Sequence, residues 1–240
     1  MYKVFFNQKP LVLTDKILET TDSSPLIFIK YTSASLIIKA LKSKNNERVY
    51  LYHKNMDKLW EIFLKKFPVI QAAGGLVERT DGKLLFIFRN DKWDLPKGGV
   101  EKKELIIEAA KREVTEETGV ADIIINNQLS ETYHIFKKGK NYRLKKTYWF
   151  KMSTSYMGPL VPQVEEGIMK TEWISNDNVN SLLKNAFENI RLIVNYHVKN
   201  NYINLFADGG TKIQELKNEV NSFTACLCGI ERSLFCELLS

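Results

Sequence analysis

The sequence predicts a protein of the α/β class, with a mixed sheet between helices. Segments of alternating or β-branched residues are interspersed with segments whose apolar residues recur at helical spacing. The 240 residues are 44% hydrophobic and 26% charged, an ordinary globular composition that excludes wholesale disorder and collagen-like or coiled-coil rods. This length suits one large domain, or a domain of about 130 to 150 residues with a smaller companion.

Residues 1–67 are predicted to form a small α/β module. Strands are expected at residues 3–6, 11–14, 26–31 and 48–52, and helices at 33–44 and 56–67. Pro68 marks the boundary, because proline disfavours helical geometry in the residue before it. The module indicates no function, so packing against the rest of the chain, homodimerisation and substrate selection stay open.

Residues 68–203 are predicted to form the larger domain. A helix is expected after the Gly98-Gly99 turn, and Ser175 is expected to cap a helical region that ends near residue 198. Residues 90–100 and 137–141 are predicted to be loops. Strands are expected at residues 69–77, 83–89, 122–136, 142–152 and 168–174.

Residues 204–240 are predicted to form a tail that holds all three cysteines, Cys226, Cys228 and Cys236. Three cysteines so close together cannot form a disulfide framework, and without a fourth ligand they do not indicate a zinc site. We read no signal peptide, and no apolar run approaches the ~18 residues that cross a bilayer. These features predict a cytoplasmic protein without a membrane partner, and the net charge of +7 suggests anionic partners such as phosphates or nucleic acid.

Three carboxylates share one edge of the helix that follows Gly98-Gly99. At 100° per residue, Glu113, Glu116 and Glu117 fall within an arc of ~100°, beside an apolar stripe that faces a core. Like charges at this spacing repel one another, so the cluster needs cations. Arg112 supplies one positive charge, and the all-oxygen donor set favours Mg²⁺, with Mn²⁺ as a substitute.

The same residues carry a more specific pattern over residues 98–120. The pattern consists of Gly98, Glu104, Arg112-Glu113, Glu116-Glu117 and Gly119, with apolar residues at 114 and 120. It matches the signature of the Nudix hydrolase family, the Nudix box, without a mismatch. The sequence therefore closely resembles that family. The resemblance implies an α/β/α sandwich and a pyrophosphohydrolase that cleaves the diphosphate linkage of a nucleoside diphosphate derivative.

The resemblance also implies roles for individual residues. Glu113, Glu116 and Glu117, with the backbone carbonyl of Lys97, would be metal ligands, Arg112 would orient the carboxylates, and Glu104 would support the site or a water. The position before the first box glutamate, glycine in many members, is Lys103, so its turn must form without glycine's freedom. The general base varies within the family between a box glutamate and a distant loop, and Glu165 and Glu166 are the loop candidates here.

Two further segments bear on the substrate. The stretch Trp93-Asp94-Leu95-Pro96-Lys97-Gly98 resembles the entry to the box in branches that act on dinucleoside polyphosphates, which makes Trp93 and Lys97 candidate substrate-binding residues. Six Lys or Arg residues lie between positions 137 and 146 among aromatic residues, so Lys146 and Tyr142 are further candidates. Because side chains alternate along a strand, only about half of this segment can face one ligand.

The leading hypothesis is thus a Mg²⁺-dependent hydrolase of nucleoside polyphosphates or nucleoside diphosphate derivatives, with diadenosine polyphosphates as candidate substrates. One alternative is a hydrolase of 5′-capped or triphosphorylated RNA, in which the basic hairpin holds the strand. The other is a regulatory protein that senses a nucleotide and contacts a partner through residues 1–67.

Overall fold

A computed structural model describes residues 1–207, with side chains described as far as His197. Residues 2–193 form one compact body, and the chain from Val194 onward groups separately. Cys226, Cys228 and Cys236, and with them most of the predicted tail, lie outside the described residues. No helix among the described residues is long and apolar enough to cross a membrane.

The N-terminal elements follow the predicted order. Ser33 caps the first helix by accepting from the backbone N–H of Leu36, and Asn55 caps the second by accepting from that of Lys58. Residues 29–31, expected to continue a strand, instead form a 3₁₀ helix, η1 (Ile29–Tyr31). The other elements are β1 (Tyr2–Phe6), β2 (Lys9–Thr14), β3 (Leu26–Phe28), α1 (Ala34–Lys42), β4 (Val49–Tyr52) and α2 (Met56–Lys66).

Pro68 directly follows α2 and its cap Phe67, and the next strand begins at Val69. The predicted loop at residues 90–100 contains two short strands, residues 92–94 and 97–99. They were not predicted because the segment is rich in glycine and proline. The helical region after Ser175 is broken into two helices, and the second runs to residue 207 rather than ending near 198. The elements are β5 (Val69–Arg79), β6 (Leu84–Arg89), β7 (Lys92–Asp94), β8 (Lys97–Gly99), α3 (Ile106–Thr118), β9 (Ile124–Gln128), β10 (Thr132–Lys138), β11 (Asn141–Thr154), η2 (Val164–Glu166), β12 (Ile168–Ile174), α4 (Asn176–Leu183) and α5 (Glu188–Ala207).

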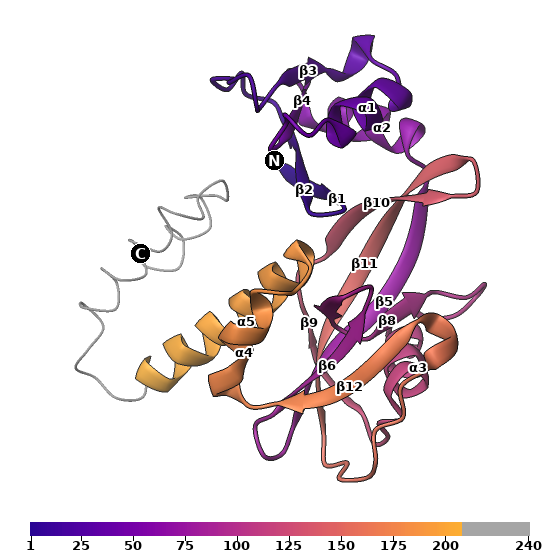
Figure 1. Cartoon of the computed structure of the whole chain (residues 1–240), viewed down its shortest axis with the longest axis vertical. Coiled ribbons are helices and arrows are strands. Elements are labelled where there is room, and N and C mark those ends of the chain that lie inside the picture. The colour runs from indigo at the N-terminus through magenta and orange to yellow at the C-terminus, as the bar shows by residue number, and fades with distance from the viewer. Residues whose placement is uncertain (208–240) are drawn as a thin grey trace. The chain divides into compact units, whose positions relative to one another are not determined.

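All described strands belong to one mixed sheet, in the order β12-β6-β5-β11-β10-β1-β2-β4-β3, with β7, β8 and β9 attached to β6, β5 and β11. The long strand β11 lies parallel to β5 and antiparallel to β10 (Figure 1). The N-terminal strands join this sheet because β1 pairs in parallel with β10, with Val4 opposite Tyr133 and Phe6 opposite Ile135. The predicted α/β class with a mixed sheet is confirmed.

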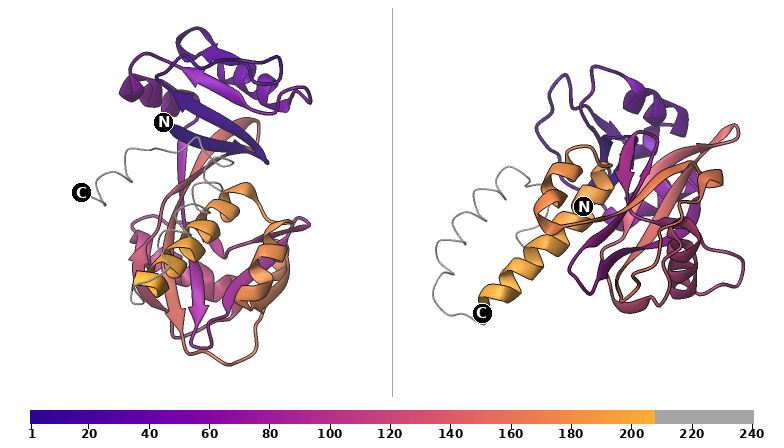
Figure 2. Two further views of the ribbon diagram at one scale, coloured as in Figure 1. Left: turned by 90° about the vertical axis from the view of Figure 1, so that its left-hand side faces the viewer. Right: turned by 60° about the horizontal axis from the view of Figure 1, so that its bottom comes forward.

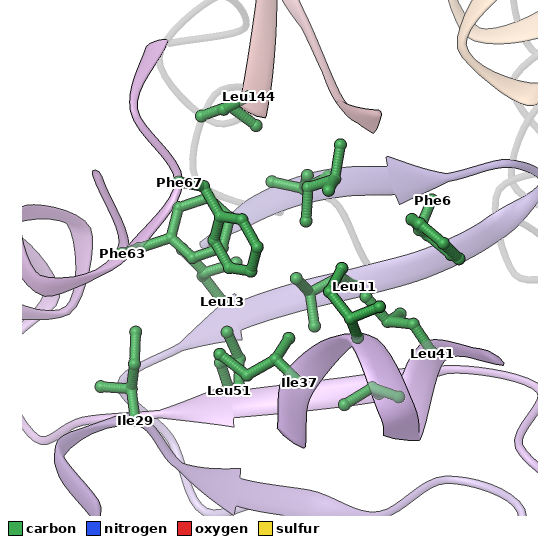
Figure 3. Packing of buried hydrophobic residues seen from close by; sticks show 14 of the residues in the cluster. Phe6, Leu11, Leu13, Ile29, Ile37, Leu41, Leu51, Phe63, Phe67 and Leu144 are labelled. Carbon is green, nitrogen blue, oxygen red and sulfur yellow. The ribbon is translucent and has the colours of Figure 1, made fainter. Parts of the chain in front are cut away.

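The N-terminal part buries an apolar core that strand β11 helps to complete. Leu11 and Leu13 of β2, together with Phe63 of α2, are fully buried in this cluster (Figure 3). Ile135 of β10 and Leu144 of β11 belong to the same cluster and are also fully buried. The first 67 residues therefore share their core with the β10–β11 hairpin.

A second core lies between α3 and the sheet. Ala110 and Val114 of α3 pack against Ala73 of β5 and Phe150 of β11. Figures 1 and 2 show α3 on one side of the sheet and α4 on the other, which is the predicted sandwich of helices around a sheet. This arrangement presents the carboxylates of α3 to the end of β8.

Candidate active site

Glycines allow the box to fold tightly. Gly98 lies on β8, opposite Ala73 of β5, and a Cβ atom at this position would collide with the carboxylate of Glu113. Helix α3 ends at Gly119, which has a φ of 75° and donates its N–H to the carbonyl of Thr115. Lys103, at the position where many relatives have glycine, has a φ of 70°, the left-handed region that glycine favours.

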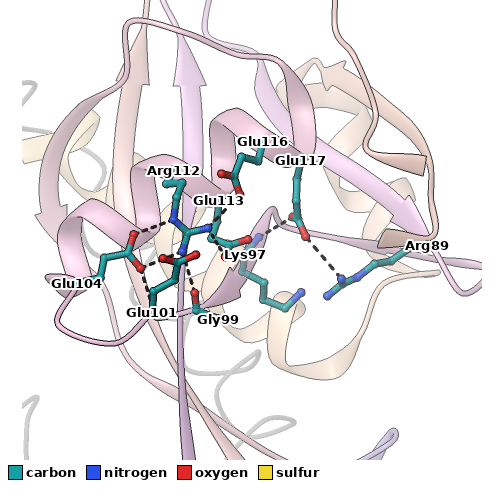
Figure 4. A network of polar contacts seen from close by, with 9 residues as sticks. All are labelled: Arg89, Lys97, Gly99, Glu101, Glu104, Arg112, Glu113, Glu116 and Glu117. Atoms are coloured by element: carbon teal, nitrogen blue, oxygen red, sulfur yellow. Dashed lines mark hydrogen bonds and ion pairs between the residues drawn. The ribbon is translucent and has the colours of Figure 1, made fainter. Parts of the chain in front are cut away.

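Arg112 forms the centre of an ionic network on α3 (Figure 4). Its Nε and Nη2 donate to the two oxygens of Glu104 at 2.7 and 2.9 Å, and Nη2 also donates to the carbonyl of Gly99 at 2.9 Å. Its Nη1 donates to Glu113 at 2.8 Å and to Glu116 at 3.0 Å. One guanidinium therefore connects three box carboxylates with the end of β8.

These contacts fix the charge states of the network. The hydrogen bond from Arg112, with that from the backbone N–H of Glu101, lowers the pKa of Glu104 to about 2. Burial, with a smaller contribution from Glu116 and Glu166, raises the pKa of Glu113 against the opposing effect of Arg112. Glu104 is thus a firmly ionised partner for Arg112, whereas the site penalises charge on Glu113.

Glu117 is buried at the C-terminal end of α3. Its Oε2 accepts the backbone N–H of Lys97 at 2.8 Å, and its Oε1 lies 3.7 Å from Nη1 of Arg89. Burial raises the pKa of Glu117 to about 7, against the opposing effects of Lys97 and Arg89. A buried carboxylate with a raised pKa is a typical feature of a functional site.

The side chain of Lys97 lies in a second ionic cluster. Its Nζ lies 2.6 Å from Asp94, which also accepts from Nε of Arg89 at 3.0 Å. Burial, and then the neighbouring Arg89, lower the pKa of Lys97 to about 8. Burial alone would raise the pKa of Asp94, but Lys97 and Arg89 hold it below its ordinary value. Lys97 thus has a protein partner in the structure, and its predicted role as a phosphate ligand stays untested.

The backbone of Lys97 is oriented as a metal ligand would require. Lys97 lies opposite Gly74 in the ladder of β5 and β8. The N–H of Gly75 donates to the carbonyl of Pro96, and the N–H of Val100 donates to that of Gln71, so the pair Lys97 and Gly74 is a non-hydrogen-bonded pair. In an antiparallel ladder, the N–H and C=O at such a position point away from the neighbouring strand. The N–H points to Glu117 accordingly, which places the Lys97 carbonyl on the outer edge of β8, away from β5.

The donor set fits a hard divalent cation in the type of its atoms. It consists of carboxylate oxygens from α3 and the carbonyl of Lys97 on β8, and all-oxygen ligation is what Mg²⁺ and Mn²⁺ prefer. In their present rotamers, Glu113 and Glu116 share Arg112 while Glu117 faces Lys97 and Arg89. Consistent with this, no three acidic, histidine or cysteine side chains among the described residues already form a metal centre.

The two loop candidates for the general base differ in position. Glu165 and Glu166 both lie in η2, and both are exposed. The charge of Glu166 acts on Glu113, Arg89 and Lys145, which places it within electrostatic range of the box. Glu165 is not among the charges that act most strongly on these three groups.

The remaining predicted substrate residues are engaged elsewhere. Trp93 packs edge-on against Phe88, 5.1 Å between ring centroids, close to the box. Lys146 forms an ion pair with Glu131 at 2.8 Å. Tyr142 packs against Phe6 in the N-terminal core. The structure therefore does not bring Tyr142 or Lys146 to the carboxylates.

Sequence reasoning did not single out Arg89 and Asp94, which contact Glu117 and Lys97, or Lys145, on whose charge these groups act. Arg89 ends β6, a strand with no motif to distinguish it. Lys145 was hidden among the six basic residues of the hairpin, because the sequence does not show which residues of β11 share a face. Asp94 belongs to the Trp-Asp-Leu-Pro-Lys-Gly segment before the box. Its i,i+3 spacing to Lys97 was the sequence signal that could have predicted their ion pair.

Comparisons with known proteins agree with this geometry. A family model described as the NUDIX domain matches residues 69–196. An RNA pyrophosphohydrolase of Sphingopyxis alaskensis is 33% identical over 101 residues, which cover 36% of this chain and 64% of that protein. The uncharacterised Nudix hydrolase YvcI of Bacillus subtilis is 30% identical over 116 residues, which cover 47% of this chain and 71% of that protein.

Among solved structures, a mutator MutT protein from Bacillus halodurans is 30% identical, with a TM-score of 0.36 over 47% of this chain and 72% of its own. The chain spans just under two thirds of the length of the RNA pyrophosphohydrolase. The family model, however, covers more than half of the 240 residues and contains the complete box. The chain is a member of the Nudix family.

Proposed function

We propose that the protein is a metal-dependent hydrolase that cleaves the diphosphate linkage of a nucleoside polyphosphate or another nucleoside diphosphate derivative. The observation that supports it best is the complete set of box side chains, which α3 and β8 bring together around Arg112 and Gly98. A protein that only sensed a nucleotide would have no need for every one of these carboxylates.

Glu113, Glu116, Glu117 and the carbonyl of Lys97 would hold Mg²⁺. When bound, the ion neutralises phosphate oxygens and lowers the pKa of a coordinated water. Arg112 positions these carboxylates, because its guanidinium also anchors to Glu104 and to the backbone of Gly99.

Three glutamates of this chain are candidates to accept the proton of the attacking water. A box carboxylate with a raised pKa, such as Glu113, is one. Glu166 is the stronger candidate on η2, since its charge acts on the box, and Glu165 is the weaker one. The rate profile against pH for Glu166→Gln and Glu165→Gln distinguishes them, because loss of the base removes its limb of the profile.

The substrate we favour is a dinucleoside polyphosphate such as a diadenosine polyphosphate, because of the Leu95-Pro96-Lys97-Gly98 entry to the box. The test is incubation with Mg²⁺ and a panel of diadenosine polyphosphates, ADP-ribose, nucleotide sugars and nucleoside triphosphates. Turnover of ADP-ribose alone would contradict the substrate assignment.

The mechanism itself is tested by Glu116→Gln, which removes a proposed metal ligand without changing the shape of the side chain. The rate should fall by several orders of magnitude. Glu108→Gln, at an exposed position on the same helix, is the matched control and should retain the normal rate. Near-normal turnover by Glu116→Gln would contradict the proposed metal site.

The 5′ end of a capped or triphosphorylated RNA is a second candidate substrate, supported by the resemblance to an RNA pyrophosphohydrolase. The hairpin tip exposes Lys137, Lys138 and Lys140. Tyr148 lies in the same row as Gly98, seven residue steps along β11 from Asn141 at this tip, a distance of roughly 23 Å. A strand held at the tip would extend several nucleotides beyond the cleaved bond, so binding should weaken steeply with salt, and substitution of the three lysines should reduce that dependence.

A further inference from the structure

We propose that Lys145, which lies beside His134 on the sheet, forms an anion-binding position for a substrate phosphate that is not held by the metal. This inference rests on the proposed function and deepens it: the preferred substrate carries at least one phosphate beyond the diphosphate that is cleaved.

The register of the sheet places Lys145 on the face opposite α3. Lys145 lies beside His134 of β10, and four residues further along β11 Trp149 lies beside Gly74, itself opposite Lys97. Alternation along β11 puts Lys145 and Trp149 on one face, whereas Phe150 packs towards α3. Lys97 confirms the direction, because its Nζ lies 5.9 Å from the centre of the Trp149 ring.

This face gathers three cations, Arg89, Lys97 and Lys145. Asp94 binds both Arg89 and Lys97, and Glu117 is the other acid that faces Arg89. Lys145 has neither an ion pair nor a hydrogen bond with any described residue, and its nearest ring contact is Phe136, at 5.2 Å. If Glu117 binds a metal ion, Asp94 and the exposed Glu166 are the two acids that remain for the three cations.

The electrostatic surroundings of Lys145 agree with this count. Burial and then Arg89 lower the pKa of Lys145, and Asp94, Glu117 and Glu166 act in the opposite direction. These are the same groups that surround the box, so the ammonium of Lys145 lies within electrostatic range of the proposed metal ligands. His134 is kept neutral here, because burial and then Lys145 lower its pKa to about 4.

The cost of this arrangement indicates a function. A partly buried ammonium without an anionic partner destabilises the fold, and a methionine of similar length would fill the same space at no electrostatic cost. Residues that oppose stability in this way are typical of binding sites. A phosphate is the anion that fits, because a nucleotide held at the adjacent box brings several of them.

The experiment compares Lys145→Met with Lys151→Met, a matched control on the same strand and face whose ammonium is paired with Glu78. The kcat and KM values are measured with Mg²⁺ for diadenosine tetraphosphate and for ADP-ribose, whose phosphates are only the cleaved pair. Lys145→Met should raise KM for the tetraphosphate by about 10- to 100-fold, the effect of one charge-assisted hydrogen bond. It should change KM for ADP-ribose by less than about threefold, and Lys145→Arg should retain tight binding.

Two further measurements keep the proposal falsifiable. The melting temperature of Lys145→Met should equal or exceed that of the wild type, so that a loss of binding is not a loss of folding. Calorimetric titration with inorganic tripolyphosphate should show binding to the wild type and to Lys151→Met that Lys145→Met lacks.

The outcomes separate this inference from the proposed function. Wild-type protein that hydrolyses neither substrate, yet binds tripolyphosphate through Lys145, would contradict the proposed hydrolysis and support the anion site. Equal KM changes for both substrates, or tripolyphosphate binding that does not depend on Lys145, would overturn the inference. If Lys146→Met, rather than Lys145→Met, selectively raised KM for the tetraphosphate, the inference would be overturned, because Lys146 would then be the residue that binds the phosphate.

Discussion

Truncation of Leu144 to alanine tests whether the first 67 residues and the Nudix domain fold as one body. Leu144 lies on β11, is fully buried, and belongs to the core that Leu11, Leu13 and Phe63 form. Removing a buried leucine side chain costs about 2–5 kcal/mol, because transfer energy is lost and a cavity remains. For a body of this size, each kcal/mol lowers the melting temperature by roughly 2–4 °C, so a decrease of about 5–15 °C is expected.

Scanning calorimetry and the temperature dependence of turnover provide the assay. Because β1 pairs with β10 and the core is shared, Leu144→Ala should shift a single transition, and hydrolase activity should be lost over that same transition. Leu36→Ala, at a position 52% exposed on α1, should shift it by about 1–2 °C at most. Two separate transitions, of which Leu144→Ala moves only the one that leaves activity intact, would refute the argument.

Three other predictions concern single residues. The neutral Nε2 of His134 accepts the N–H of Asn7, and the pKa of His134, about 4, lies below the ordinary 6.5. Between these two pKa values the unfolded chain binds a proton that the folded chain does not, so the free energy of unfolding should fall by about 2 kcal/mol between pH 6.5 and 4.5. His134→Gln should lose that part of the pH dependence of the urea midpoint. Lys103→Gly relieves a left-handed backbone, so its free energy of unfolding should equal that of the wild type or exceed it by up to about 1 kcal/mol, whereas Lys103→Val should lower it; urea unfolding measures both. Asp94→Asn removes the buried anion that Arg89 and Lys97 share and should cost about 3–5 kcal/mol of unfolding free energy. An unchanged urea midpoint would show that these cations find other partners.

The local parts of the fold were predictable because their signals are local. Strand β12 (Ile168–Ile174) has the predicted bounds, and α1 (Ala34–Lys42) lies within the predicted helix at residues 33–44. The box was predictable in full, since its spacing alone places the carboxylates on one edge of α3. The strands β7 and β8 were missed because a loop rich in glycine and proline lacks the β-branched pattern of a strand.

The pairing of distant strands could not be predicted in the same way. No local pattern shows that β1 lies beside β10, more than a hundred residues away, so the N-terminal residues looked like a module with its own core. The lack of a local signal for strand pairing also affected the prediction of the site. The hairpin was identified as basic, but the choice between Lys145 and Lys146 depends on the register with β10, and a shift of one residue exchanges the two faces.

Strand β11 connects the two parts of the molecule through adjacent side chains. Leu144 is buried in the N-terminal core, and the next residue, Lys145, faces the cations beside the box. A rigid strand transmits position along its length, so the packing of Leu144 determines where the ammonium of Lys145 lies. Changes in the N-terminal core should therefore alter KM for long phosphate chains before they alter kcat. Leu144→Ala, assayed well below its melting temperature, should show this selective effect, and an unchanged KM for diadenosine tetraphosphate would mean that the strand holds Lys145 without support from the N-terminal core.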